Sequence, residues 1–293
     1  MGLQVARLLI KRLLWVASPR PVDSDVKYYA DLLDRDGIVA IPDFLPPAEF
    51  AAVKEEFEWS RAQEHKSRCK PVNNLVSETY NLSAHAGEFP AIRAYVEENP
   101  VIYKLASAVL RCKVKYTAPV YAEIWRCPDP NAPNTDIENV LHADVHYPTV
   151  KLWLYMDDID EGCGAYIYAF GSHRLTLARV RHEYEMSVRD AMMRRGRVWE
   201  IPTHLLDRGR IRVSDECLVK MKIIETQICG KANTLVFSNN SGFHKRGVFA
   251  SSRGRAALSM SYRYVESLHH RIYPWLWTTP RPGNAYIPGR VPV

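Results

Sequence analysis

The N-terminal part of the chain shows apolar residues at helical spacing, interrupted by one short apolar run. Helical periodicity predicts a short helix over 23–34, and the apolar run at 37–41 predicts a buried strand. A proline at the first helical position opens each of two further predicted helices, over 47–64 and 100–110. The pattern up to residue 113 therefore predicts a helical layer.

Beyond residue 113 the pattern changes to short β-rich runs separated by Pro, Gly, Asn and Asp turns. The predicted strands are 120–125, 151–156, 164–170, 232–237 and 255–264. A basic, partly helical stretch at 174–222 interrupts them, and we interpret it as an insertion or a lid over one end. Helices followed by many short strands predict an α+β protein whose second half is a β-sandwich or barrel.

The two ends of the chain differ from this core. Residues 3–16 place polar and apolar side chains on different faces of a helix, within an extension at 1–22. This segment is too short and too charged to span a bilayer. It either packs on the protein's own core or lies in a membrane interface among anionic lipids. Residues 271–293, rich in proline and aromatic residues, predict an irregular tail, which leaves one domain over 23–270.

Charge adds a preference for anionic partners. The 293 residues are 47% hydrophobic with a net charge of +6, which excludes a disordered chain, a collagen-like rod and a disulfide mini-protein. Residues 23–173 carry 14 Lys/Arg against 24 Asp/Glu, whereas residues 174–222 carry 12 against 7 and residues 250–293 carry 6 against 1. These basic flanks favour an anionic small-molecule or lipid-linked substrate, with solvated faces as the alternative. Without basic stretches interleaved with aromatic residues, nucleic acid is not expected.

The cysteines bear on the compartment. The sequence has 6 cysteines, and no two of them are separated by only two residues. This distribution is unlike a zinc knuckle, a redox motif or a disulfide framework. We therefore expect free thiols in the cytoplasm, with a peripheral position at a membrane surface as the alternative address.

The triplet His142-Ala143-Asp144 is the main candidate for chemistry. In an extended segment alternate side chains share a face, so His142 and Asp144 point into the same space. His244 lies just beyond the predicted strand at 232–237 and offers a third ligand. Two imidazoles and one carboxylate on a single face of an iron ion form the triad of non-haem Fe(II) oxygenases, which leaves positions open for a cosubstrate and O2.

A 2-oxo acid cosubstrate would also need a cation for its distal carboxylate. Arg255 lies at the head of an alternating strand, eleven residues past His244, and a guanidinium can hold a carboxylate bidentately. Lys151 competes with Arg255 for this role if the strand face that it shares with Trp153 and Tyr155 lines the pocket. The sequence leaves this choice open.

Three ordered blocks carry a family resemblance. They are His142-Ala143-Asp144-Val145-His146-Tyr147 with residues 151–158 after it, residues 160–165 leading to Phe170-Gly171-Ser172-His173-Arg174, and Ser241-Gly242-Phe243-His244-Lys245-Arg246-Gly247 with Arg255 beyond it. Over about residues 115–265 the chain resembles the phytanoyl-CoA dioxygenase-like family of Fe(II)/2-oxoglutarate oxygenases. Two positions depart from the family: Phe170 replaces a proline, and Arg246 stands where members can place another polar residue.

The resemblance implies a double-stranded β-helix, a jelly-roll or cupin-like core with an N-terminal helical layer and a helical insertion between core strands. It implies His142, Asp144 and His244 as iron ligands, Arg255 as the anchor of 2-oxoglutarate, and Trp153 beside this cosubstrate. The implied activity is a dioxygenase that hydroxylates a C–H bond of a small-molecule, acyl or lipid-linked substrate and releases succinate and CO2. The alternatives are a metal-dependent hydrolase or isomerase on a cupin-like barrel and a non-catalytic binding member of the family.

Two further histidines lie near these blocks. His146 shares a face with Asp144 in an extended segment and is either a partner of the ligands or a packed histidine. His173 follows a Gly-Ser turn, and we expect it to be structural.

Overall fold

The computed structural model describes residues 3–63, 68–72, 75–114, 117–131, 137–144, 148–193, 211–213, 215–250 and 253–263. By its internal contacts the chain divides into two units, Met1–Arg263 and Tyr264–Val293. The first unit is described below. The predicted tail at 271–293 and His146 lie outside the described residues.

The described helices occur before residue 111 and again within residues 177–221. They are α1 (Leu3–Ala17), α2 (Lys27–Asp36), α3 (Pro47–Arg61), α4 (Pro90–Ile92), α5 (Pro100–Leu110), α6 (Leu177–Met193) and α7 (Asp215–Met221). Shorter turns of helix lie at Ser24–Val26, Ser83–His85, Arg93–Glu97 and Ile137–Asn139. Asn99 caps α5, because its side-chain oxygen accepts a hydrogen bond from the Val101 N–H at 3.0 Å. Helix α2 ends at Gly37, whose φ of 84° lies in the left-handed region that glycine adopts without strain.

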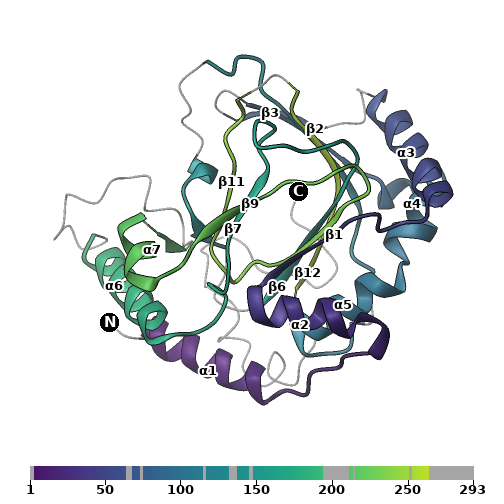
Figure 1. Ribbon diagram of the computed structural model, residues 1–293. Helices are drawn as coiled ribbons and strands as arrows, with labels where there is room; N and C mark the ends of the chain where they lie inside the picture. Colours follow the sequence, from purple (N-terminus) through teal and green to yellow (C-terminus); the bar gives the residue numbers. More distant parts are fainter. Residues whose placement is uncertain are drawn as a thin grey trace. The chain divides into compact units, whose positions relative to one another are not determined.

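The described strands form two antiparallel sheets (Figure 1). The larger sheet has the order β1 (Ile38–Ile41), β10 (Leu235–Asn239), β6 (Thr149–Tyr155), β12 (Arg255–Arg263), β4 (Tyr121–Arg126), β3 (Leu75–Asn81), β2 (Arg68–Val72). The smaller sheet has the order β8 (Ile211–Arg212), β5 (His142–Ala143), β11 (His244–Arg246), β7 (Tyr166–Ala169), β9 (Glu225–Ile228). Strands distant in sequence alternate within each sheet, which is the jelly-roll arrangement. The predicted α+β fold with a double-stranded β-helix core is confirmed.

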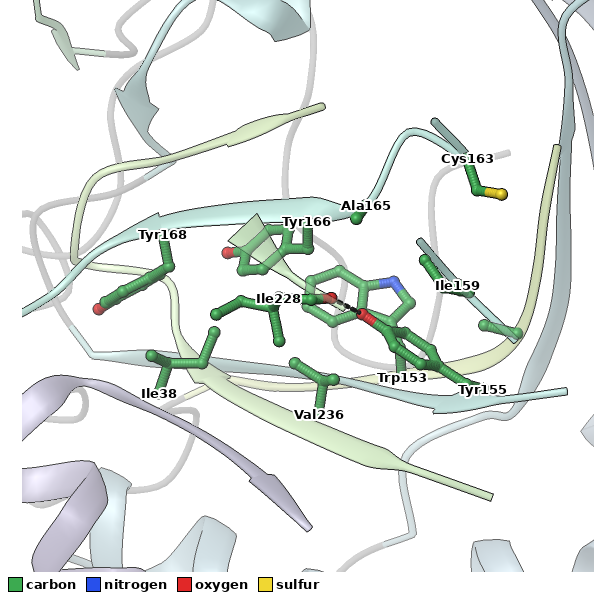
Figure 2. Packing of buried hydrophobic residues seen from close by; sticks show 11 residues of the cluster. Ile38, Trp153, Tyr155, Ile159, Cys163, Ala165, Tyr166, Tyr168, Ile228 and Val236 are labelled. Carbon is green, nitrogen blue, oxygen red and sulfur yellow. Dashed lines mark hydrogen bonds between the residues drawn. The ribbon is translucent and has the colours of Figure 1, made fainter. Parts of the chain in front are cut away.

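An apolar layer lies between the two sheets (Figure 2). Trp153 of β6 packs against Tyr166 of β7, with ring centroids 4.6 Å apart. Tyr155 is buried, and its hydroxyl donates a hydrogen bond to the Ile228 carbonyl at 2.8 Å. Because side chains alternate along a strand, Lys151 lies on the same inner face of β6 as Trp153 and Tyr155. The inner face of β6 therefore carries both apolar packing and a charged group.

The predicted helical layer is present, and it covers the outer side of the larger sheet. Helix α2 contacts α5 and β1, and α5 contacts β6 (Figure 1). Leu152 and Leu154, which alternate with the inner residues of β6, are fully buried. Burial of both faces explains why β6 reads as a nearly continuous apolar run.

The prediction of helices with one strand at 37–41 before residue 113 misses two strands. Strands β2 and β3 form a hairpin there, and β3 joins the larger sheet by pairing with β4. The sequence gives no alternating signal for this hairpin, because Ser77, Glu78 and Thr79 place a polar run in the middle of β3. The helix predicted to reach residue 64 ends earlier, at Arg61.

Helix α1 packs on the protein through Trp15. The Trp15 side chain is buried, and its indole N–H donates a hydrogen bond to the Val109 carbonyl at 3.0 Å. The guanidinium groups of Arg12 and Arg111 lie 3.9 and 4.4 Å from the centroid of its ring. Leu13 of the same helix is 69% exposed, so α1 also presents apolar surface outward. Among the described residues, no helix has the length and apolar character needed to cross a membrane.

Candidate metal centre

The two histidines of the predicted triad lie opposite each other in the smaller sheet. Antiparallel pairing of β5 with β11 places His142 directly across from His244, with ring centroids 4.7 Å apart. Both side chains are buried. The turn before β11 requires glycine at position 242, because a Cβ on Gly242 would overlap the Tyr168 hydroxyl. Strand pairing and this close approach together fix the two rings.

Asp144 brings a carboxylate to the same centre. His142, Asp144 and His244 each offer one ligand atom, and these three atoms all lie within 4.8 Å of one another. Asp144 Oδ1 is 3.7 Å from His142 Nε2, and Asp144 Oδ2 is 3.6 Å from His244 Nε2. Adjacent ligands of an octahedral ion with bonds of about 2.1 Å lie about 3 Å apart, so the three ligand atoms would draw closer together around a bound ion. The set fits a divalent metal ion held on one face.

Hydrogen bonds orient both imidazoles for coordination through Nε2. His142 Nδ1 donates to the Val140 carbonyl at 2.8 Å, and His244 Nδ1 donates to the Gly242 carbonyl at 3.0 Å. Because a carbonyl only accepts, each Nδ1 carries a proton. Burial lowers the pKa of His244 despite the nearby Asp144 carboxylate. A neutral imidazole with a lone pair on Nε2 is the form that a metal ion binds.

Asp144 is held as an anion. Burial acts to raise the pKa of its carboxyl group, but the contact with His244 and the charge of Lys151 outweigh burial and lower this pKa well below its usual range. Lys151 Nζ donates a hydrogen bond to Asp144 Oδ2 at 2.6 Å. The carboxylate is therefore in the protonation state that coordination requires.

A cavity of about 240 Å³ opens beside these groups. It is lined by Tyr121, Glu123, Glu138, His142, Lys151, Trp153, Tyr166, Asn240, His244, Lys245, Arg246, Arg255, Ser259, Met260 and Ser261. The structure thus brings the predicted residues Lys151, Trp153 and Arg255 into one space with both histidines. Four of the lining residues are Lys or Arg and two are Glu.

Arg255 lies in a buried polar cluster. Its Nη1 donates to the Gly164 carbonyl at 2.9 Å and its Nη2 to Glu123 Oε1 at 3.3 Å. Burial acts to raise the pKa of Glu123, but Arg255 and the Trp125 indole outweigh it, so this pKa is lowered. The Glu123 carboxylate also accepts from Trp125 Nε1 at 2.6 Å. Arg255 has five N–H donors, and these contacts fix its orientation toward the cavity.

The sequence did not point to two side chains close to the ligand atoms. Glu138 Oε2 lies 3.2 Å from His142 Nε2, and Asn240 Nδ2 lies 3.1 Å from His244 Nε2. Glu138 sits in a short helical turn and Asn240 in the turn after β10. Neither position carries a spacing signal, since only the folded sheet brings them to the centre.

His173 lies apart from this cavity, as its structural interpretation requires. It is buried, and its Nε2 donates to the Asp34 carbonyl at 3.1 Å. Burial lowers the pKa of His173 to about 4, so this ring is neutral.

Fold and site define a jelly-roll protein with a candidate centre of two histidines and one carboxylate. No protein-family model matches the chain, and no curated protein matches its sequence. Among solved structures, EctD from S. alaskensis with bound Fe is similar at a TM-score of 0.52, with 14% identity, over 84% of this chain and 78% of that chain. The epimerase SnoN in complex with Fe3+, alpha ketoglutarate and nogalamycin RO is similar at a TM-score of 0.50, with 15% identity, over 91% of this chain and 94% of that chain. At these identities the likeness shows the fold.

Proposed function

We propose that the chain is a non-haem Fe(II)- and 2-oxoglutarate-dependent dioxygenase, as the family resemblance also implies. The observation that carries the proposal is the convergence of His142, Asp144 and His244 on one centre beside the cavity that Arg255 lines. EctD, solved with bound Fe, and SnoN, solved with Fe3+ and alpha ketoglutarate, support it through their shared fold. Bound Fe(II) would supply the chemistry that couples oxidation of a substrate C–H bond by O2 to conversion of 2-oxoglutarate into succinate and CO2.

Different residues of this chain would hold the metal ion and form the cavity wall beside it. His142 and His244 present Nε2 lone pairs because each Nδ1–H is held by a carbonyl, and Asp144 presents an anion. Trp153 and Tyr166 pack together at the cavity wall and exclude water from one side of the centre. The buried ligands and this apolar wall keep the site preorganised before a cosubstrate enters.

We assign the distal carboxylate of 2-oxoglutarate to Arg255 rather than to Lys151. In the β12–β6 register Lys151 lies opposite Ser261, six residues along β12 from Arg255. Both side chains nevertheless reach the same cavity. Lys151 is bonded to the ligand Asp144, at the metal end of the cavity. Arg255 therefore stands at the end where a carboxylate distant from the metal would lie.

Hydroxylation is the outcome that we propose, on an anionic small-molecule, acyl or lipid-linked substrate. The cavity supports the charge preference, because Lys245 and Arg246 line it in addition to Lys151 and Arg255. The Arg246 guanidinium is held 3.6 Å from the centroid of the Trp125 ring. SnoN, an epimerase, shows that the same fold accommodates another outcome, so product analysis decides between them.

Succinate formation provides the test. We expect the purified protein to convert 2-oxoglutarate to succinate with Fe(II) and O2, and to lose this conversion with Zn(II) or without O2. A hydrolase or isomerase would instead act with Zn(II) or Mn(II) and ignore 2-oxoglutarate. A non-catalytic binding protein would form no succinate under any condition. Either of these two results, measured on folded protein, would contradict the proposed function.

We also propose that α1 contacts a membrane surface. Leu9, Leu13 and Val16 lie at helical spacing and are 38%, 69% and 53% exposed, while Trp15 anchors the helix to the protein. We expect co-sedimentation with vesicles containing anionic lipid and its loss in Leu13→Asp. Leu177→Asp, at a residue that is 90% exposed on α6, is the matched control. Failure of the unmodified protein to sediment with such vesicles would disprove this contact.

A further inference from the structure

Helix α6 inserts a buried ion pair beneath the turn that presents His244. Arg179 Nε donates to Glu183 Oε1 at 2.8 Å, with side-chain exposures of 6% and 0%. These residues are four apart and so share one face of the helix. Burial of both charges is costly unless the pair is well bonded, which suggests that this pair serves more than the stability of α6.

The Arg179 guanidinium spans the backbone on both sides of the turn. Its Nη1 donates to the Ser172 carbonyl at 2.7 Å and its Nη2 to the Ser241 carbonyl at 3.3 Å. The same guanidinium lies 3.8 Å from the centroid of the Phe243 ring. The Ser172 hydroxyl completes the arrangement by accepting from the Phe243 N–H at 2.7 Å. Arg179 therefore holds Ser241, on one side of Gly242, by a hydrogen bond. It holds Phe243, on the other side, through the ring contact and through Ser172.

Gly242 supplies the carbonyl that orients His244. His244 Nδ1 donates to this carbonyl at 3.0 Å, which leaves Nε2 directed at Asp144. A displacement of the turn would move the carbonyl and release the ring to rotate or change its tautomer. Arg179 thus acts on the candidate metal centre through two intermediate residues, without touching a ligand.

The other histidine has a corresponding support from the same insertion. Arg212 Nη1 donates at 3.3 Å to the Val140 carbonyl, which also accepts from His142 Nδ1. His182, on the same face of α6 as Arg179, donates from Nε2 to the Arg212 carbonyl at 3.2 Å. The insertion therefore contacts the Val140 carbonyl, the partner of His142, directly through Arg212. It supports the Gly242 carbonyl, the partner of His244, through the neighbouring residue Ser241.

We propose that Arg179 is a positioning residue that fixes the Nδ1–H tautomer and ring orientation of His244, with Glu183 holding the guanidinium in place. Helix α6 and strand β8 of the insertion then support the metal centre from one side. This inference rests on the proposed function only in assuming that His244 binds a metal ion. The tautomer of His244 in metal-free protein is independent of that function.

The test compares two double variants of α6 with matched chemistry. Arg179→Met with Glu183→Gln removes the buried pair without leaving a lone charge. Arg181→Met with Glu185→Gln is the control. It removes an exposed pair on the same helix, which has the same i, i+4 spacing and the same 2.8 Å distance between Nε and Oε1. The readouts are 15N NMR of the histidine rings without metal and the dissociation constant for Co(II) followed by its visible spectrum.

In the buried-pair variant we expect the His244 ring to lose its single Nδ1–H tautomer while the His142 ring keeps its own. We expect the Co(II) dissociation constant to rise by roughly 10- to 100-fold, the usual effect of losing such a supporting contact. Arg179→Lys keeps the charge but cannot span two carbonyls, so it should fall in between. The proposal would be overturned if the folded buried-pair variant kept the His244 tautomer. It would also be overturned if Arg179→Lys matched the unmodified protein in both the tautomer and the Co(II) dissociation constant. Absence of Co(II) binding by the unmodified protein would contradict the proposed function and leave the tautomer result standing.

Discussion

His142→Ala should abolish succinate formation from 2-oxoglutarate. The substitution leaves one imidazole and one carboxylate at the centre, and two ligands do not hold a divalent ion on one face of the site. We expect turnover to fall by at least about 1,000-fold, which corresponds to roughly 4 kcal/mol of transition-state stabilisation. The measurement is succinate released per enzyme under saturating Fe(II), 2-oxoglutarate and O2.

His173→Ala is the matched control for this loss. His173 is also a buried histidine with a backbone carbonyl partner, but it bonds the Asp34 carbonyl and does not line the cavity. The control removes the same side chain and should retain turnover if the protein stays folded, which thermal unfolding checks. Substantial activity in His142→Ala, or equal losses in two folded variants, would rule out the assignment of His142 as a ligand.

The strands that the sequence predicted are those with an apolar run or an alternation of at least four residues. β6 is a nearly continuous apolar run because both of its faces are buried, and β12 alternates along its nine residues, so both patterns can be seen in the sequence. β5 and β11, which carry the two histidines, span two and three residues. A strand that short has no period, so only pairing in the folded sheet defines it.

The candidate site shows the same division. His142 and Asp144 could be paired from sequence because they are two residues apart, and His244 because it follows a strand. Glu138 and Asn240 reach the same centre only through tertiary structure. Arg179 is less accessible still, since its position in an ordinary i, i+4 charge pair resembles the exposed Arg181–Glu185 pair beside it. The sequence predicted the candidate ligands, whereas burial and backbone contacts identify what orients them.

Arg255→Leu should separate the two cations that sequence left as alternatives for the distal carboxylate. Loss of a buried guanidinium that binds a carboxylate typically costs 2–5 kcal/mol, so we expect the 2-oxoglutarate KM to rise by about 100-fold. Lys151→Leu should change the KM much less, because Lys151 neutralises Asp144 at the metal end. Arg255→Leu alone would remove the guanidinium that bonds the buried Glu123 carboxylate, so the variant is made together with Glu123→Gln, and Glu123→Gln alone is the control.

A cosubstrate lacking the distal carboxylate makes this test specific. 2-Oxopentanoate has the same carbon chain as 2-oxoglutarate and keeps the 2-oxo acid group that would meet the metal, but it ends in a methyl group. If Arg255 holds the distal carboxylate, the unmodified protein prefers 2-oxoglutarate strongly, and this preference in kcat/KM collapses in the Arg255 variant because neither cosubstrate then finds a cation. The preference should persist in Lys151→Leu and in Glu123→Gln. Collapse in Lys151→Leu with retention in the Arg255 variant would transfer the role to Lys151, since only the group that binds the carboxylate can distinguish the two acids.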